Sequence, residues 1–296
     1  MEIIIFAPAS STIGGSHAIR MSALAKILAE SKHKIIFFEE LKSLKDYVNQ
    51  VHKKTFVIID VPPNFNHNLD FLHKNDLVRI GYEYSGELEV DYNIVPFVFK
   101  SRHFKASKVL YRGLEYLILR PEIKLSSSKS IKQAIDVVIS LGAGDTLDKA
   151  EEIRRKILKM HEDFNVKIIL GKYSIHTNDI EKYVTTDPID FFDIINSAAY
   201  IVTNSGTTLV EAIYLQKRIL AWPQNELELE FALYLQQFYE FELISEHTDK
   251  FNLNKIVAPK IRSNITMNKL DGEGVQRVQK LIDGIVSAEM DNLNVL

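Results

Sequence analysis

The sequence of 296 residues has no cysteine. This absence excludes disulfide bonds, thiolate metal sites and cysteine nucleophiles, and it is typical of proteins in a reducing compartment. Long apolar runs are also missing: no window approaches the roughly 18 apolar residues that span a bilayer, so we expect no transmembrane segment. The first six residues carry an acidic side chain where a secretion signal would be basic. We therefore predict a cytoplasmic protein.

An excess of positive charge is absent as well. Lysine and arginine number 36 against 39 aspartates and glutamates, which gives a net charge of −3. A nucleic-acid-binding protein would show a basic face, so we expect no nucleic acid partner. The apolar fraction of 46% is ordinary for a protein with a buried core. Because the length exceeds the usual range for a single core, the sequence predicts two α/β domains.

Short β-rich runs alternate with segments of helical period, a pattern typical of βαβ units in parallel sheets. We predict strands at Ile3–Ala7, Lys34–Phe38, Thr55–Asp60, Leu77–Tyr82, Asp91–Phe97, Asp136–Leu141, Val166–Leu170, Ala199–Thr203 and Arg218–Trp222. We predict helices at His17–Glu30, Leu41–Val51, Asn68–His73, Leu147–His161, Ile189–Ser197, Thr207–Leu215, Leu229–Tyr239 and Gly274–Met290.

One cluster of small polar residues, Leu125–Ser130, indicates a linker. The predicted domains are therefore 1–125 and 131–272, and a helix within 273–296 is expected to pack back toward the first domain. Open parallel sheets bind ligands at the carboxyl ends of their strands, and we expect the two domains to face each other across a cleft. Site residues are therefore expected at strand ends.

In the second domain a turn of small residues joins a predicted strand to a predicted helix. Backbone N–H groups at a helix start lack partners and carry partial positive charge. The turn Ser205-Gly206-Thr207-Thr208 lets an anion approach these donors, and its hydroxyls can add hydrogen bonds. Glu211, one turn further on, is a candidate acceptor for ribose hydroxyls. The alternative is an ordinary N-cap with a capping-box partner at Glu211.

Two further strand ends carry polar or glycine-rich loops. One contains Gln224 and Asn225. The other contains Gly142 and Gly144, which permit close approach of the backbone, although no third glycine completes a dinucleotide fingerprint.

The first domain has its own glycine turn after its first strand. Gly14 and Gly15 make the turn, Ser16 is a good N-cap, and His17 falls in the first helical turn. The helix dipole disfavours a positive charge there, which suits a neutral imidazole acting as a general base. The alternative is an ordinary packed or solvated histidine. The other histidines form no metal-binding pattern and no P-loop is present, so we expect no metal and no cofactor.

Three segments together resemble a known family: residues 13–20 (Ile-Gly-Gly-Ser-His-Ala-Ile-Arg), residues 113–122 (Gly-Leu-Glu-Tyr-Leu-Ile-Leu-Arg-Pro-Glu) and Ser205–Glu211. In order and spacing they are similar to the nucleotide-sugar hydrolases of pseudaminic acid biosynthesis (UDP-2,4-diacetamido-2,4,6-trideoxy-altropyranose hydrolases) and to their relatives in spore-coat polysaccharide synthesis. These families belong to the GT-B superfamily, alongside the MurG-like glycosyltransferases. The resemblance extends from residue 1 to about residue 240, and residues 113–122 are its most specific part.

The resemblance implies a GT-B-like α/β fold of two Rossmann-type domains, with UDP on the second domain and the sugar facing the first. It implies that His17 is the general base that activates water for an inverting attack on the anomeric carbon, which releases UDP without a metal. From the resemblance, Gly206, Thr207 and Thr208 would hold the diphosphate, Glu211 the ribose, and Gln224 and Asn225 would lie near the diphosphate and sugar. With the strand-end residues of both domains, the predicted substrate-binding residues are Gly14, Gly15, Ser16, Arg20, Asp60, Tyr82, Gly142, Gly144, Ser205, Gly206, Thr207, Thr208, Glu211, Gln224 and Asn225.

The sequence departs from this family in the first domain. Ser16 replaces a glycine, and Asp60-Val61-Pro62 and Gly81-Tyr82 stand where the family has other sugar-side motifs. Three hypotheses therefore stay open. The chain is a hydrolase that supplies a free sugar for a nonulosonic acid or another surface glycan, a glycosyltransferase with a sugar or lipid acceptor, or a non-catalytic protein that binds a nucleotide sugar.

Overall fold

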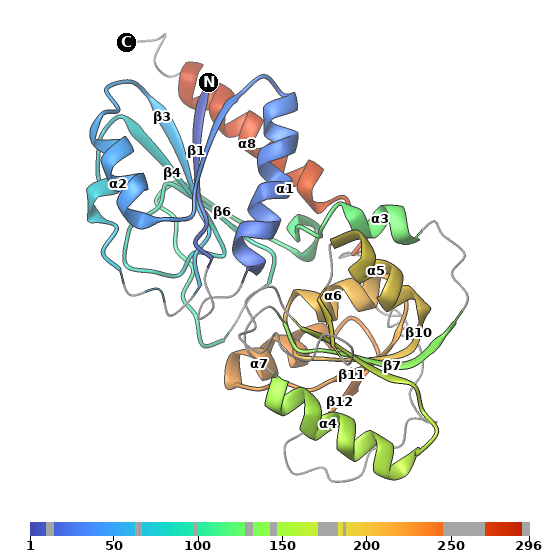
Figure 1. Ribbon diagram of the computed structural model, residues 1–296. Coiled ribbons are helices and arrows are strands. Elements are labelled where there is room, and N and C mark those ends of the chain that lie inside the picture. The colour runs from blue at the N-terminus through green and yellow to red at the C-terminus, as the bar shows by residue number, and fades with distance from the viewer. Residues whose placement is uncertain are drawn as a thin grey trace. The chain divides into compact units, whose positions relative to one another are not determined.

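The computed structural model describes residues 1–9, 15–62, 65, 67–97, 100–127, 133–142, 147–170, 183–185, 188–244 and 270–291. The chain divides into two compact units (Figure 1). Unit 1 comprises Met1–Ala9, Ser16–Ile118 and Lys269–Leu296, and unit 2 comprises Ser10–Gly15 and Leu119–Asn268.

Unit 1 is built on a parallel sheet in the order β2-β1-β3-β4-β5-β6. The strands are β1 Glu2–Phe6, β2 Lys34–Phe38, β3 Thr55–Ile59, β4 Leu77–Tyr82, β5 Tyr92–Val95 and β6 Val109–Arg112. Every residue of the central strands β1 and β3 is buried, because helices cover both faces of the sheet. Their alternate residues therefore enter two different hydrophobic clusters, one on each face.

Helices from both ends of the chain cover one face of this sheet. Helix α1 (Ser16–Glu30) and helix α8 (Gly274–Asp291) lie side by side in Figure 1 and share one cluster with β1, β3 and β4. The other face carries α2 (Leu41–Asn49) and the 3-10 turn η1 (Asp70–Leu72). A second 3-10 turn, η2 (Leu114–Tyr116), contacts α8.

Helix α8 is fastened to unit 1 at both of its ends. At its start, a Cβ on Gly274 would lie 1.9 Å from the carbonyl oxygen of Leu117, so only glycine fits there. Near its end, buried Glu289 accepts hydrogen bonds from Lys54 Nζ at 3.0 Å and Tyr92 Oη at 2.7 Å, and it also pairs with Lys108. These contacts fix the register of α8 along the sheet.

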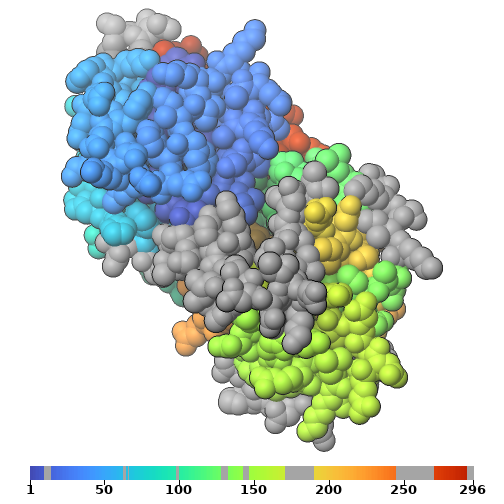
Figure 2. All heavy atoms as spheres, in the orientation of Figure 1, coloured from blue at the N-terminus to red at the C-terminus, as the bar shows by residue number. Residues whose placement is uncertain are grey.

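Unit 2 is a second parallel sheet, in the order β12-β11-β10-β7-β8-β9. Its strands are β7 Ile135–Ser140, β8 Val166–Leu170, β9 Tyr183–Thr185, β10 Ala198–Thr203, β11 Arg218–Ala221 and β12 Glu242–Leu243. Its helices are α3 Glu122–Ser127, α4 Leu147–Met160, α5 Pro188–Ser197, α6 Thr207–Tyr214 and α7 Glu226–Leu235. The amphipathic helix α4 buries Ala150, Ile153 and Ile157 and forms the yellow-green surface of Figure 2.

The predicted α/β class is confirmed, and each predicted strand has a counterpart within about two residues of its expected ends. Strands β6, β9 and β12 and helix α3 were not predicted. The linker prediction was wrong for Leu125–Ser127, which form the end of α3, because Ser126 is anchored there by Asp193 and Asn196. Residues 128–130 lie outside the described residues. Across the described part of the chain, no helix has the length and apolar character required to cross a membrane.

Candidate functional site

The carboxyl ends of three neighbouring strands of unit 1 bring together a histidine, an arginine and two carboxylates. Helix α1 begins at Ser16, directly after Gly15, so Ser16 is the first helical residue and not the N-cap that its sequence indicates. His17 Nδ1 lies 2.7 Å from Asp60 Oδ1. Asp60 directly follows β3, and Glu83 directly follows the adjacent strand β4. This is the sheet edge at which open parallel sheets hold their ligands.

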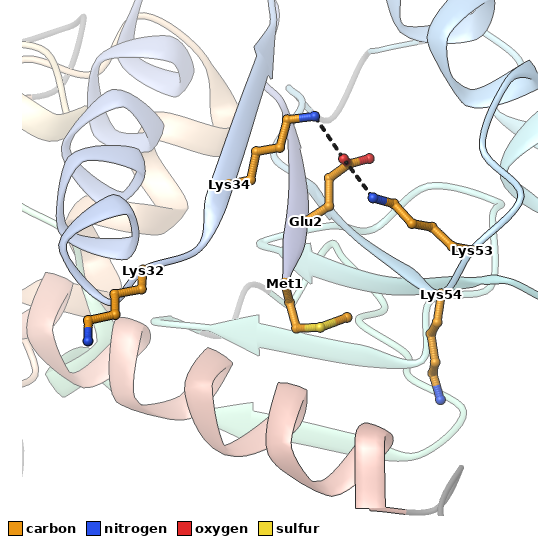
Figure 3. Close-up of a pocket in the computed structure, with 6 residues that line it drawn as sticks. All are labelled: Met1, Glu2, Lys32, Lys34, Lys53 and Lys54. Atoms are coloured by element: carbon orange, nitrogen blue, oxygen red, sulfur yellow. Dashed lines mark hydrogen bonds and ion pairs between the residues drawn. The ribbon is translucent and has the colours of Figure 1, made fainter.

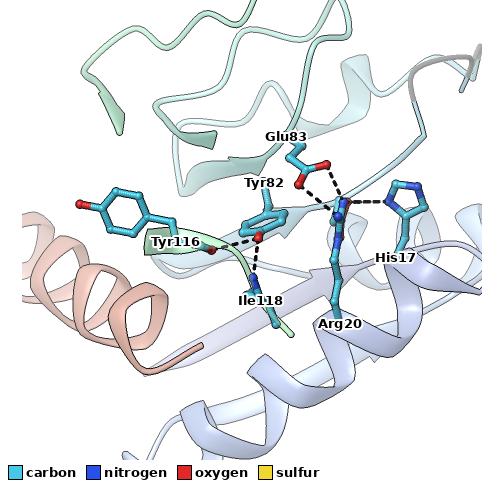
Figure 4. A network of polar contacts seen from close by, with 7 residues as sticks. His17, Arg20, Tyr82, Glu83, Tyr116 and Ile118 are labelled. Atoms are coloured by element: carbon cyan, nitrogen blue, oxygen red, sulfur yellow. Dashed lines mark hydrogen bonds and ion pairs between the residues drawn. The ribbon is translucent and has the colours of Figure 1, made fainter. Parts of the chain in front are cut away.

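Arg20 joins these groups, and Figure 4 shows it between His17 and Glu83. It lies three residues after His17, on the same face of α1. Its Nε and Nη2 atoms donate to the two oxygens of Asp60, both at 2.6 Å, and its Nη1 and Nη2 atoms donate to Glu83, both at 3.1 Å. The guanidinium carbon also lies 4.8 Å from the ring centre of Tyr82. Each N–H group of Arg20 that faces Asp60 or Glu83 therefore donates a hydrogen bond to it.

The two carboxylates share one guanidinium, but their pKa values are shifted in opposite directions. Burial alone would raise the pKa of the Asp60 carboxyl, but Arg20 and His17 outweigh it and hold that pKa below its usual value. Burial raises the pKa of Glu83, and the attraction of Arg20 does not offset it. The backbone of Glu83 has φ +53°, an uncommon conformation for a residue with a side chain and one that clusters at functional sites. The lowered pKa keeps Asp60 ionised at neutral pH.

The Asp60 carboxylate determines which nitrogen of His17 carries the proton. An ionised carboxylate only accepts hydrogen bonds, so Nδ1 must donate to it. Arg20 Nη2 is also 3.2 Å from Nδ1, but its two N–H groups donate to Asp60 and Glu83. In the neutral imidazole the lone pair is then on Nε2. The His17 side chain is 13% exposed.

Asp60, Arg20 and Tyr82, which the sequence predicts as substrate contacts, have their side chains buried among protein groups. Asp60 is 0% and Tyr82 is 1% exposed. The Tyr82 hydroxyl donates to the carbonyl of Tyr116 and accepts from the backbone N–H of Ile118, and burial raises its pKa well above the usual value. Asp60 bonds to His17, Arg20 bonds to Asp60, and Tyr82 packs against Arg20. All three side chains are buried.

In unit 2, the turn between β10 and α6 leaves its donors unpaired. Gly206 is the N-cap of α6 and no side chain caps the helix, so the capping-box alternative does not hold. The first hydrogen bond of the helix runs from Leu209 N to the Gly206 carbonyl. Among the described residues nothing accepts from the N–H groups of Thr207 and Thr208, and the buried hydroxyl of Ser205 also has no partner. Unpaired donors at a helix start are a favourable arrangement for binding an anion.

Two further strand ends gather at this turn. Gly142, with φ +98°, follows β7, and a Cβ there would lie 3.3 Å from Asn204 Nδ2. After β11, Asn225 caps α7 by accepting from Glu228 N at 3.0 Å. The side-chain nitrogen of Gln224 is buried without a partner. The structure thus brings the predicted residues of β7, β10 and β11 together, while the predicted residues Gly14 and Gly144 lie outside the described residues.

Glu211 has a partner that sequence reasoning missed. Arg120 Nε and Nη2 donate to its two oxygens at 2.6 and 2.5 Å. The Arg120 guanidinium lies 4.3 and 4.5 Å from the ring centres of Phe191 and Phe192, and Glu211 is only 2% exposed. Burial would lower the pKa of Arg120, but Glu211 raises it. The resemblance pointed to residues 113–122 as a signature, and this ion pair is what its arginine does in the structure.

A pocket of about 320 Å³ in unit 1 lies at the opposite strand ends (Figure 3). Its four lysines do not converge on a free anion site. Lys34 and Lys53 both pair with Glu2, at 3.1 and 3.3 Å, and Lys54 pairs with Glu289. Because Glu2 begins β1 while His17 follows the end of β1, this pocket is separate from the candidate site.

Comparison with known proteins supports the architecture. The structure resembles UDP-GlcNAc 2-epimerase of Methanocaldococcus jannaschii with a TM-score of 0.52 and 12% identity, over 96% of this chain and 99% of that one. It resembles the spinosyn forosaminyltransferase SpnP with a TM-score of 0.52 and 11% identity, over 84% of this chain and 87% of that one. It also resembles MurG of Acinetobacter baumannii with a TM-score of 0.50 and 10% identity, over 82% of this chain and 85% of that one. The fold is of the GT-B type. The predicted GT-B-like class is confirmed, and the arrangement of its two units stays a prediction.

The sequence comparisons do not identify an activity. No protein-family model matches the chain. A curated relative from Methanocaldococcus jannaschii, the uncharacterized protein MJ1062, is 26% identical; the match covers 78% of this chain and 57% of the relative. The chain therefore spans little more than half the length of the relative that it matches.

Proposed function

We propose that this protein cleaves a nucleotide sugar, with His17 as the general base. The observation that carries the proposal is the hydrogen bond of 2.7 Å between His17 and Asp60, held from behind by Arg20. A buried carboxylate that fixes the tautomer of a histidine and leaves Nε2 free is the arrangement that general-base catalysis needs. Two of the structural neighbours are named for UDP-GlcNAc epimerisation and for sugar transfer, which is consistent with this substrate class.

The proposed reaction is an inverting hydrolysis. His17 Nε2 takes a proton from water while the water oxygen forms a bond to the anomeric carbon. The bond between that carbon and the diphosphate oxygen breaks, and its electron pair leaves with the nucleoside diphosphate. Asp60 stabilises the imidazolium that forms, without taking the proton itself. The products are a free sugar of inverted anomeric configuration and UDP.

Unit 2 would bind the leaving group. The unpaired N–H groups of Thr207 and Thr208 and the hydroxyl of Ser205 would donate to the diphosphate, and the backbone at Gly206 allows its close approach. The positive end of α6 would stabilise the charge that develops as the bond breaks, so the proposal requires no metal ion.

Glu211 would accept hydrogen bonds from the ribose. Arg120 occupies one lone pair on each of its oxygens, and each oxygen keeps another, so a pair of adjacent hydroxyls can still bind. We expect Glu211→Ala to weaken the binding of UDP in isothermal calorimetry. An unchanged dissociation constant would show that the nucleotide does not bind at Glu211.

A glycosyltransferase is the second candidate, since SpnP is a sugar transferase by name and shares the fold. In that case His17 would deprotonate a hydroxyl of a sugar or lipid acceptor in place of water. The decisive experiment incubates the protein with a panel of nucleotide sugars and follows free sugar and nucleotide by mass spectrometry. Release of sugar without an acceptor supports the hydrolase for a surface-glycan or nonulosonic acid precursor, whereas release only with an acceptor supports the transferase.

The role of His17 has a matched control within unit 1. His33 Nε2 lies 2.8 Å from Asp283 Oδ1, which is a similar His–Asp pair at a different place in the unit. We expect His17→Ala to lower turnover by roughly 10²-fold or more while UDP still binds, because a positioned base contributes about that much. We expect His33→Ala to retain turnover. Equal turnover in the two variants would refute the assignment of the base.

A further inference from the structure

Glu228 connects two loops that belong to different strands of unit 2. It lies in the first turn of α7, and its carboxylate points back at both strand ends. Oε1 accepts from the side-chain nitrogen of Asn204 at 2.8 Å, and Oε2 accepts from the backbone N–H of Gln224 at 2.7 Å. Asn204 directly follows β10, and Gln224 lies in the loop after the neighbouring strand β11. One side chain therefore fixes the distance between these loops.

The carboxylate also fixes the orientation of the Asn204 amide. Because Glu228 can only accept hydrogen bonds, Asn204 must turn its nitrogen toward Glu228. Its oxygen then points elsewhere, and it is buried without a hydrogen-bond partner. A Cβ on Gly206 would lie 3.4 Å from that oxygen, which places it beside the start of α6.

Three buried polar atoms without partners belong to the two loops that Glu228 joins. They are Asn204 Oδ1, Ser205 Oγ and Gln224 Nε2. Buried polar atoms normally have partners, so a set of unpaired ones in adjoining loops indicates a polar ligand. The Gln224 nitrogen and the Ser205 hydroxyl can donate to phosphate oxygens. The Asn204 oxygen can only accept, so it needs a hydroxyl or amide N–H, which a sugar supplies and a fully ionised diphosphate does not.

We propose that Glu228 is the positioning residue of this binding site. It holds the loops after β10 and β11 so that Ser205 and Gln224 meet the diphosphate, while Asn204 accepts from a donor group of the sugar. This inference rests on the proposed function, because it specifies how the same nucleotide sugar is held. Glu228 itself makes no contact with the ligand in this account.

The test compares Glu228→Gln with Glu226→Gln. Both substitutions remove one negative charge from the first turn of α7, but Glu226 is exposed and only Glu228 bonds to the loops. A glutamine at 228 would turn an N–H group toward one of its two donors, so one of the two charge-assisted hydrogen bonds is lost. We expect the dissociation constant of UDP to rise about tenfold in Glu228→Gln and to stay unchanged in Glu226→Gln. Binding of uridine, which has no phosphates, should be equal in both.

A second variant separates positioning from folding. Asn204→Ala leaves α7 and its cap intact, so thermal unfolding should stay near that of the wild type while UDP binding weakens. A variant with both Glu228→Gln and Asn204→Ala should bind UDP no more weakly than the single variant of lower affinity, because both changes break the same connection. Equal UDP binding by Glu228→Gln and Glu226→Gln, in a wild-type protein that binds UDP, would overturn this inference alone. A wild-type protein that binds neither UDP nor any nucleotide sugar would overturn the proposed function, and this inference with it.

Discussion

The substitution Asp60→Asn separates the chemistry of the His17 site from its packing. Asparagine has nearly the same shape as aspartate, so the space beside β3 stays filled. In the orientation that keeps the hydrogen bond from Arg20 Nε, its nitrogen takes the place of Oδ1 and faces His17 Nδ1. A nitrogen that faces an N–H group forces His17 to move its proton to Nε2, and the lone pair that would accept the proton from water is lost.

The structure predicts unequal losses of activity and stability. Turnover should fall by about 10²- to 10⁴-fold, the range for losing a positioned base and the carboxylate that supports it. Removing one partner of a buried ion pair usually costs about 3–5 kcal/mol. Here Arg20 keeps Glu83, and the negative charge of Asp60 is one reason that the pKa of Glu83 is raised. Without that charge Glu83 ionises more readily and pairs with Arg20, so we expect a loss of only about 1–3 kcal/mol.

Two measurements test this reasoning. Turnover is followed with the nucleotide sugar that the wild type processes, and the free energy of unfolding is taken from urea denaturation at pH 7. Glu83→Gln is the control, since it changes the other carboxylate on the same guanidinium; its turnover should fall by less than about tenfold because His17 keeps Asp60. A folded Asp60→Asn variant with turnover close to that of the wild type would refute the role of the His17–Asp60 pair.

Two further predictions concern α8. Burial would raise the pKa of Glu289, but its two lysines and its tyrosine lower it from about 4.5 to about 2, so its contribution to stability is present above pH 4.5 and is lost as the pH falls through 2. The shift corresponds to a stabilisation of about 3.4 kcal/mol at most. Because the lysines reach solvent, we expect Glu289→Gln to lower the free energy of unfolding, measured by urea denaturation, by about 1–2 kcal/mol at pH 7 and by less at pH 3. An equal loss at both pH values would contradict this. Gly274→Ala should destabilise by about 3 kcal/mol, because the new methyl group would overlap Leu117. Gly284→Ala, with nothing within 4 Å, should stabilise α8 by about 0.5–1 kcal/mol in thermal unfolding, and similar melting temperatures for the two variants would refute the packing argument.

Local sequence patterns were sufficient for most of the fold. Strands such as β1 and β3 are continuous apolar runs because both faces of the sheet are covered, and this signal needs no knowledge of the partners. Helix α3 was missed for the opposite reason. Its Ser126 is a poor helix former, and its contacts with Asp193 and Asn196, nearly 70 residues away, help to hold the segment in place.

The candidate site was predictable only in part, because its key contacts join distant residues. The glycine turn before His17 and the small residues before α6 are local signals of ligand binding. The carboxylate that orients His17 lies 43 residues away, and Arg120 lies 91 residues from Glu211. No spacing rule connects such pairs until the sheet order is known. Glu228 had no signal of its own, since an acidic residue in the first turn of a helix is commonplace.

The return of α8 to unit 1 has a consequence for how the protein is made. Five buried apolar residues of α8, from Val275 to Val286, complete the hydrophobic cluster between α1 and the sheet. A ribosome that has finished Ile118 must still translate all of unit 2 before this helix exists, which takes on the order of 10 to 30 s at ordinary elongation rates. During that interval one side of unit 1 exposes an apolar surface on the nascent chain. Unit 2 can therefore finish folding first, and chaperones that bind exposed apolar segments have their clearest target on the amino-terminal unit.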